Sequence, residues 1–387
     1  MIRTGLLERV EDIPADGWDA LGDPRYPFLR HAFLAALAEG GSIGGRSGWQ
    51  PFIVTLSDDQ GLAAAAPGWL KPHSYGEYVF DFAWAQAYAR HGLQYYPKLV
   101  VAAPFTPATG PRLLVRADLD HPAVASALLS ALAAAADDRG LSSTHVLFPA
   151  EADRQVIAAA GATGDDGWLM RRDCQFHWHN RGYAHFEDFL AGFTAEKRKK
   201  ARRERRRVAE EGITFRTVYG RDAAPAEVLA AWQLHRGTFL RRGQEPYLGL
   251  ECFRVLARSL GHSLLFKFAE RRGAIVAVAV FFVGGDTLYG RYWGAADEFH
   301  SLHFETCYHQ GIEHCIEHGI ARFEPGTQGE HKVARGFVPT LTHSAHRIAD
   351  PRFRRAIADY LRAEGASVDE YAAGIGEHVP YRQELTP

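Results

Sequence analysis

The chain has 387 residues, of which 47% are apolar, and its 44 basic and 46 acidic residues nearly cancel. This composition excludes a disordered chain and predicts two or three domains with a core in each. The longest apolar stretch, Ala274–Val283, is too short to cross a bilayer, and residues 1–17 lack the apolar centre of a signal peptide. The four cysteines show no CxxC spacing. We therefore expect a cytoplasmic protein with reduced cysteines and no membrane span.

The first half, residues 1–182, predicts a domain of alternating strands and helices. We expect strands at residues 4–10, 51–56, 62–70, 99–103, 112–115 and 144–148. Helical segments are expected before residue 39 and at residues 122–138 and 151–160. An insert rich in aromatic residues, residues 71–98, interrupts this series.

A basic segment, residues 183–212, follows and predicts a helical connector. Nine of the eleven residues from 197 to 207 are Lys or Arg, and no Pro or Gly occurs from 195 to 211. Thr194 suits the N-cap and Gly212 the end of the helix. The charges point in all directions, so we expect no buried apolar face. The run is either a solvated connector or a contact for phosphates, with Lys197, Arg198, Lys199, Arg202 and Arg206 as candidate RNA-binding residues.

The second half, residues 213–387, predicts a second domain with a similar order of elements. Strands are expected at 213–218, 264–270, 274–283, 287–293, 321–324 and 341–348. Helices are expected at 227–240, 250–260 and 302–318, and after Pro351. The repeat is one of element order, because the two halves share no visible sequence identity.

Four stretches carry a resemblance to a known family: residues 73–112, 175–190 (QFHWHNRGYAHFEDFL), 288–294 (LYGRYWG) and 323–337 (FEPGTQGEHKVARGF). Together with the repeated order, they resemble the Fem-like (FemAB-type) predicted N-acyltransferases of the GNAT superfamily. The resemblance implies an α/β (α+β) fold of tandem GNAT-type domains. Each domain is expected to hold a mixed, mainly antiparallel sheet flanked by helices, with the basic helix between them.

The resemblance also implies transfer of an aminoacyl group, with aminoacyl-tRNA as the favoured donor and an amine as the acceptor. GNAT enzymes that use CoA hold its diphosphate on a glycine-containing loop at a helix N-terminus. The corresponding segments here, residues 296–303 and 116–121, lack glycine and carry acids. We therefore expect no cofactor. An acyl-CoA-dependent N-acyltransferase and a non-catalytic RNA-binding or scaffold protein remain the alternatives.

The loop at residues 323–337 is the leading candidate for the catalytic site. Its glycines predict an irregular path just after a strand, a common place for functional groups. Lys332 resembles the Lys that lies at the donor carbonyl in Fem proteins, and Glu330 and His331 adjoin it. Glu324 and Arg335 are candidate substrate-binding residues in the same loop. The alternative is a structural loop held by an ion pair between Glu330 and Arg335.

Two further regions offer candidate substrate-binding residues. In and after the insert they are His73, Tyr75, Glu77, Asp81, Lys98 and Thr106, since acids among aromatic rings suit an acceptor amine. The alternative is a partly buried helix whose rings belong to the core. In the strand at 287–293 they are Arg291 and Tyr292, which otherwise pack at the edge of the core. His303, Cys307, His314 and His318 share helical spacing, but we expect no metal because no further ligand follows. The oligomeric state is left open.

Overall fold

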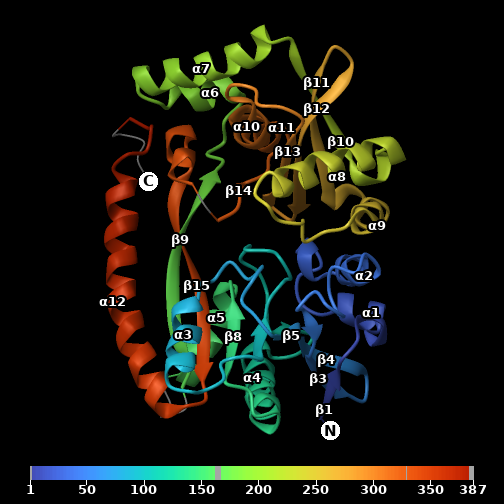
Figure 1. Ribbon diagram of the computed structural model, residues 1–387, viewed down its shortest axis with the longest axis vertical. Coiled ribbons are helices and arrows are strands. Elements are labelled where there is room, and N and C mark those ends of the chain that lie inside the picture. The colour runs from blue at the N-terminus through green and yellow to red at the C-terminus, as the bar shows by residue number, and fades with distance from the viewer. Residues whose placement is uncertain (1, 162–166, 328, 383–387) are drawn as a thin grey trace. The chain divides into compact units, whose positions relative to one another are not determined.

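The computed structural model describes residues 2–161, 167–327 and 329–382. Contacts divide the chain into two compact units (Figure 1). Unit 1 comprises Met1–Asp173 with Leu341–Asp369, and unit 2 comprises Cys174–Thr340 with Glu370–Pro387. The domain boundaries predicted at residues 182 and 212 stay a prediction.

Unit 1 contains two sheets. The first has the order β1-β3-β4-β7 and is antiparallel, with β1 (Arg3–Leu7), β3 (Ile53–Asp58), β4 (Gly61–Ala66) and β7 (Leu114–Val115). The second has the order β15-β8-β6-β5-β2, with β2 (Gln50–Pro51), β5 (Gly68–Lys71), β6 (Lys98–Val101), β8 (Ser143–Leu147) and β15 (Val338–Ile348). The single strand predicted at 62–70 is therefore two strands in different sheets, which part at Pro67, a residue without an N–H group for a ladder.

The helices of unit 1 are α1 (Ala15–Asp19), α2 (His31–Glu39), α3 (Phe82–Arg90), α4 (His121–Asp138), α5 (Glu151–Gly161) and most of α12 (Pro351–Gly376). The insert predicted at 71–98 contains α3, whose Trp84 and Tyr88 are buried with Tyr95 in a small core that also includes Ile357 of α12. Trp84 and Tyr88 therefore belong to the core, as the alternative for the insert expected, whereas Tyr75 and Phe82 are exposed.

Unit 2 contains one sheet with the order β10-β11-β12-β13-β14-β9. Its strands are β10 (Ile213–Tyr219), β11 (Leu264–Arg271), β12 (Ala274–Gly284), β13 (Thr287–Ala295), β14 (Arg322–Glu324) and the end of β9 (Leu169–His179). Its helices are α6 (Phe186–Ala191), α7 (Ala195–Glu210), α8 (Pro225–Leu240), α9 (Leu250–Leu260), α10 (Leu302–Phe304) and α11 (Gln310–Glu317). A π-helical turn, Glu305–His309, joins α10 to α11.

The two units repeat one arrangement, which confirms the predicted tandem α/β fold with mainly antiparallel sheets. Each has one parallel pair whose strands are connected through a helix: β6 with β8, and β13 with β14. In each unit the second strand of that pair adjoins a long antiparallel strand from the other half of the sequence, β15 beside β8 and β9 beside β14. In the part of the chain that the structure describes, no helix is both long and apolar enough to cross a bilayer.

The basic helix α7 has a buried face, so the expectation of a helix without one is wrong. It lies beside α6 (Figure 1) and against the π-helical turn. Ala201 and Val208 are buried in two core clusters. Arg205 forms ion pairs with Glu305 and Glu313 at 3.1 and 2.8 Å. Two small apolar residues seven positions apart are enough to bury one face of the helix. The charged side chains beside them can lie close to unit 2 because they form ion pairs there.

Candidate functional site

The parallel strands β13 and β14 of unit 2 separate after three residue pairs. The pairing ends at Tyr289 opposite Glu324, while β13 continues to Ala295. The chain leaves β14 through Pro325 and Gly326, the latter with a φ of +98°. The backbones nearly touch there, because a Cβ on Gly290 would lie 3.2 Å from the Cα of Pro325. A strand pair that opens in this way places the following loop beside exposed strand backbone.

The loop after β14 places Lys332 in a buried position. Residues Glu330–Arg335 form a 3-10 helix between Gly329 and Gly336, whose φ values of +111° and +91° favour glycine. Lys332 is only 2% exposed, and its Nζ donates a hydrogen bond of 2.6 Å to the carbonyl oxygen of Gly326. Gln328, part of the same motif, lies outside the described residues.

Burial lowers the pKa of Lys332 to about 7, and the neighbouring Cys307 opposes this shift only in part. Among the described residues no carboxylate forms an ion pair with Lys332, so nothing restores the usual preference for the charged form. The amine therefore changes its charge near neutral pH. A group of this kind can hydrogen-bond an oxyanion as the ammonium and can accept a proton as the amine.

His331 belongs to a cluster of rings beside Lys332. Its Nε2 lies 2.9 Å from the hydroxyl of Tyr308, a residue of the π-helical turn that the sequence did not single out. Phe304 and His303 lie 5.4 and 6.2 Å from His331 by ring centroids. Burial, then Lys332 and Arg335, lower the pKa of His331, so its imidazole is neutral near pH 7. The π-helical turn is what aims Tyr308 at this loop, and such turns are frequent at functional sites.

Arg335 and Glu330 do not pair with each other, so the structural alternative drawn from the sequence is wrong in that detail. Arg335 donates two hydrogen bonds, of 2.9 and 2.8 Å, to the carboxylate of Glu204 on α7. Its guanidinium carbon also lies 3.4 Å from the ring centroid of Phe304. Glu330 instead accepts a hydrogen bond of 2.9 Å from Tyr371. Arg335 thus fastens the loop to α7, and a role of either residue toward substrate stays a prediction.

The other candidate residues of unit 2 lie on the separating strands. Glu324 is the last residue of β14 and is buried. Arg291 lies at an irregularity of β13, where Tyr292 pairs with Val280 and Gly290 pairs with Phe281, so that Arg291 has no partner position of its own on β12. Tyr292 packs its ring 4.9 Å from His235. The structure therefore brings Arg291 and Glu324 to the same opening of the sheet, next to Gly290.

A pocket of about 770 Å³ lies over the segment after β13, where a CoA-binding GNAT would hold the diphosphate. The acids Asp297 and Glu298 line it, as the sequence suggested. Arg241 and Arg242, from the end of α8 and the turn after it, line it as well. Within the described residues neither arginine forms an ion pair, so both can attract an anion. The expected repulsion of a diphosphate by the acids is therefore offset, a feature that the local sequence could not reveal.

Three potential metal ligands lie together at the C-terminal end of α11. Donor atoms of His314, Glu317 and His318 lie within 4.8 Å of one another. The Nδ1 of His318 lies 2.9 Å from the carbonyl oxygen of His314, and burial lowers the pKa of His314 to about 3. The expectation of a protein without a metal stays a prediction.

The candidate residues Glu77, Asp81 and Lys98 of unit 1 contact one another. Lys98 is 0% exposed, and its Nζ donates hydrogen bonds to Glu77 and Ser74 at 2.8 Å each and to Asp81. Burial raises the pKa of Glu77 to about 7, although Lys98 opposes this. Burial would also raise the pKa of Asp81, but Lys98 and His145 more than reverse it, to about 2. Glu77 and Asp81 thus bind the amine of Lys98, and their role toward a substrate amine stays a prediction.

This cluster continues through residues that the sequence reasoning missed. Tyr95 donates a hydrogen bond of 2.6 Å to Asp81, and its hydroxyl lies 3.3 Å from His145. The Nδ1 atoms of His145 and His346 are 2.7 Å apart. A repeated pattern could have revealed the pair, because Ser143-Thr-His145 and Ser344-Ala-His346 both place a Ser two residues before the His, and each Ser hydroxyl contacts its own His.

The remaining candidates of unit 1 differ in exposure. Tyr75 is 64% exposed and packs its ring edge-on against His73 at 5.3 Å. Thr106 is buried and donates its hydroxyl proton to the carbonyl oxygen of Pro104 at 2.9 Å. The hydroxyl of Thr106 thus serves the turn, while Tyr75 and His73 are accessible.

On α7 the candidate RNA-binding residues face outward to different degrees. Lys199, Arg202 and Arg206 are exposed, whereas Lys197 and Arg198 are half-buried. Arg202 pairs with Glu187 at 2.6 Å, and Arg206 lies 3.6 Å from Glu210. Both pairs are exposed and therefore weak, so they leave the cations able to meet phosphates.

Comparison with known proteins places the chain in a family. A model of the FemAB-like family, described as peptidoglycan biosynthesis/recognition, matches residues 9–383. Among solved structures, FemX aligns with a TM-score of 0.52 at 10% identity, over 92% of this chain and 100% of that chain. L-PGS from Bacillus licheniformis aligns with a TM-score of 0.50 at 14% identity, over 85% of this chain and 96% of that chain.

At these identities the two structures share the fold with this chain, and no curated protein matches it. The family model, in contrast, extends over nearly the whole sequence. The chain therefore belongs to the FemAB-like family, as its sequence predicted, and is an enzyme of the acyl- and aminoacyltransferase kind.

Proposed function

We propose that this protein transfers an aminoacyl group from aminoacyl-tRNA to the amine of a small or peptide-like acceptor, with Lys332 at the donor carbonyl. One observation carries the proposal most: Lys332 is a buried amine with no carboxylate partner among the described residues, in an irregular loop where two parallel strands separate. An unpaired buried amine costs stability, and proteins place such groups at reacting centres.

The reaction needs positioning and charge stabilisation more than covalent chemistry. The acceptor nitrogen attacks the ester carbonyl carbon, a C–N bond forms, and the carbonyl oxygen takes up the electron pair. In its ammonium form Lys332 donates a hydrogen bond to that oxyanion. The oxyanion then collapses, the C–O bond to the ribose breaks, and the ribose oxygen takes the proton that the attacking amine gives up. His331 adjoins Lys332, and partial burial, Lys332 and Arg335 lower the pKa of its imidazole. The neutral imidazole is able to receive that proton on its way.

The exposed cations of α7 support a nucleic acid as the donor. Lys199, Arg202 and Arg206 are exposed along one 16-residue helix, and such cations contribute affinity for phosphates without sequence preference. The family description supports a peptide-like acceptor of the peptidoglycan type. We assign no resident cofactor to the reaction.

A second donor deserves a test, because Arg241 and Arg242 line the pocket over the segment after β13. Two arginines that form no ion pair within the described part of the chain suit the phosphates of an acyl-CoA. The acyl-CoA-dependent reaction is therefore the alternative function, and it would use the same Lys332.

The experiment compares both donors on one protein. The parent protein is incubated with bulk tRNA charged with radiolabelled amino acids, or with radiolabelled acetyl-CoA. Spermidine, glucosamine and a Lys-containing peptidoglycan peptide serve as acceptors. We expect label in amides only with charged tRNA, and loss of that product in the Lys332→Met variant. Amide formation from acetyl-CoA alone would replace the proposal by its alternative, and product formation by the variant at the parent's rate would remove Lys332 from the mechanism.

A further inference from the structure

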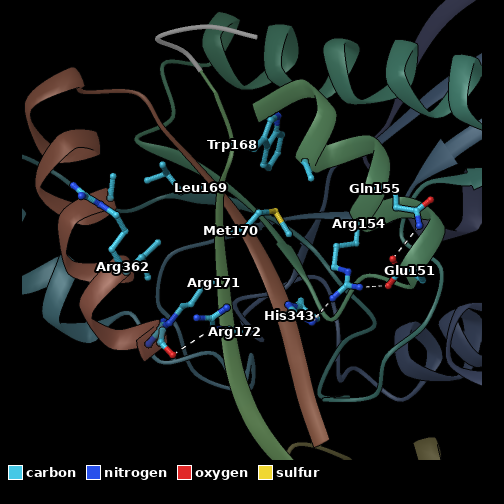
Figure 2. A pocket seen from close by; sticks show the side chains of 14 residues that line it. Glu151, Arg154, Gln155, Trp168, Leu169, Met170, Arg171, Arg172, His343 and Arg362 are labelled. Atoms are coloured by element: carbon cyan, nitrogen blue, oxygen red, sulfur yellow. Dashed lines mark hydrogen bonds and ion pairs between the residues drawn. The ribbon is translucent and has the colours of Figure 1, made fainter. Parts of the chain in front are cut away.

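Unit 1 contains a pocket of about 750 Å³ that Lys332 and its 3-10 helix do not line (Figure 2). Strands β9 and β15 form its floor, and helices α5 and α12 contribute its two sides. Small residues keep the space between the helices open, with Ala158 on α5 and Ala358 and Gly365 on α12. The volume is in the range of small-molecule sites.

The lining of this pocket divides into an apolar and a cationic part. Trp168 and Leu169 gather at one end of Figure 2, with Met170 below them. Toward the other end lie Arg171, Arg172 and His343. The lining residues include four arginines, Arg154, Arg171, Arg172 and Arg362, and one carboxylate, Glu151. A molecule with one apolar and one anionic end would match both parts.

Carboxylates near the pocket bind its arginines, but they do not use all of the N–H donors of these side chains. Arg171 uses all three of its nitrogens, because it donates to Glu364 through two nitrogens at 2.7 Å and to the carbonyl oxygen of Phe80 through the third. Arg172, in contrast, contacts Asp369 at 2.5 Å through one nitrogen and the carbonyl oxygen of Gly365 through another. A guanidinium carries five N–H donors, so Arg172 can bind a further acceptor.

Arg154, like Arg172, has N–H donors that its partners in the protein do not use. It contacts Glu151 through one nitrogen and the Nε2 of His343 through another (Figure 2). Burial, then Arg154, lower the pKa of His343, so the imidazole is neutral and accepts this hydrogen bond. The guanidinium of Arg154 keeps N–H donors for a ligand. Its carboxylate partner is 61% exposed, so the pair is screened by water.

We propose that this pocket binds an anionic amphiphile, namely a phosphate or carboxylate group on an alkyl or acyl chain. The anionic group contacts Arg172 and Arg154, and the chain lies between α5 and α12 against Trp168, Leu169 and Met170. This site is separate from the proposed transfer reaction, and its test does not depend on activity.

The test is calorimetric titration of the full-length protein with n-octyl phosphate. Inorganic phosphate and 1-octanol, which represent the anionic and the apolar half of this molecule, are titrated separately as controls. We expect one equivalent of n-octyl phosphate to bind, and each half to bind at least about tenfold more weakly, since one charge-assisted contact alone contributes that much. Equal binding of 1-octanol would overturn the anionic part. Equal binding of inorganic phosphate would overturn the apolar part. Absence of binding by n-octyl phosphate would overturn the site.

Three variants locate the site. Arg172→Met keeps the side-chain stem and removes the charge, and we expect it to weaken binding about tenfold. Ala158→Trp fills the pocket from an exposed position on α5, where the fold should tolerate it, and should abolish binding. Arg139→Met is the matched control, because Arg139 is also about half exposed and pairs with one carboxylate, Glu8, outside this pocket. Unchanged binding by Ala158→Trp, or equal loss in Arg139→Met, would overturn the assignment.

Discussion

Replacing Lys332 by Met should raise stability while it lowers activity. Burial lowers the pKa of this Lys from 10.5 to about 7. Below pH 7 the folded state therefore carries an ammonium that it disfavours, at a cost of roughly 5 kcal/mol from about 1.4 kcal/mol per pKa unit. The Met variant loses this cost and also loses the hydrogen bond to Gly326, which contributes about 1.5–3 kcal/mol. We expect a net gain of about 2–3.5 kcal/mol at pH 6.

The sign of the pH dependence follows from the same shift. The unfolded state binds more protons than the folded state between pH 7 and 10.5, so the stability of the parent rises with pH across this window. The Met variant lacks that rise. Its advantage should therefore fall to about zero near pH 9.5, where only about 1.4 kcal/mol of the cost remains. Activity at pH 6, where Lys332 is an ammonium, should fall by roughly 10²–10³, the scale for loss of one group that stabilises an oxyanion. The difference in activity should shrink at pH 9.5, where the amine of the parent is already neutral.

Urea unfolding at pH 6 and pH 9.5, with the amide-forming assay alongside, measures both effects. The matched control is Lys267→Met on β11, because burial lowers the pKa of that buried Lys too, and it lies outside the loop. The control should gain stability at low pH and keep its activity. If Lys332→Met lost stability and activity in parallel at pH 6, Lys332 would be a structural residue and the reasoning would be refuted.

Three further outcomes are expected. Acetyl-CoA should not reach a micromolar dissociation constant in calorimetric titration, and a micromolar value would promote the acyl-CoA alternative. Changing Lys199, Arg202 and Arg206 together to Gln should flatten the slope of log K for tRNA against log salt by about two to three, with unfolding unchanged, because all three are exposed; an unchanged slope would make α7 a connector only. Asp81→Asn should cost about 3–5 kcal/mol at pH 6 in urea unfolding, and Glu77→Gln clearly less, because Asp81 is the ionised partner of Lys98 while the pKa of Glu77 is raised toward neutrality; equal losses would contradict this division of charge.

Local periodicity was sufficient to predict most elements of the fold. The bounds of α9 and the hairpin of β11 and β12 follow directly from apolar spacing and from the turn at Arg272 and Gly273. The division of residues 62–70 was missed because both strands are apolar, and only the missing N–H group of Pro67 separates them. The pairing of β8 with β15 joins residues about 200 positions apart, which no local pattern encodes.

The candidate site was predictable as a set of residues and not as a set of contacts. The glycines around Lys332 indicated an irregular loop, and the structure contains one. The sequence of the loop alone predicted an ion pair between Arg335 and Glu330. This was wrong because the partner of Arg335 is Glu204, 131 positions away. The buried face of α7 was missed for a related reason, because Ala201 and Val208 count as a core face only once unit 2 supplies the surfaces that cover them.

Two buried lysines of this chain, Lys98 and Lys332, have different expected roles, one structural and one chemical. The difference comes from the groups that contact each amine, because both side chains are buried. Lys98 is fully buried. Burial lowers its pKa, but two carboxylates more than reverse this and raise the pKa, so Lys98 is charged near neutral pH. Such a group fixes a core and has no proton to exchange near neutrality. Lys332 is buried with a carbonyl oxygen and a thiol, and its pKa falls to about 7. A fold that merely needed to fill this space could use Met at lower cost. The retention of an amine there is best explained by a reaction that uses its charge and its proton, and for this reason the proposed function is centred on Lys332.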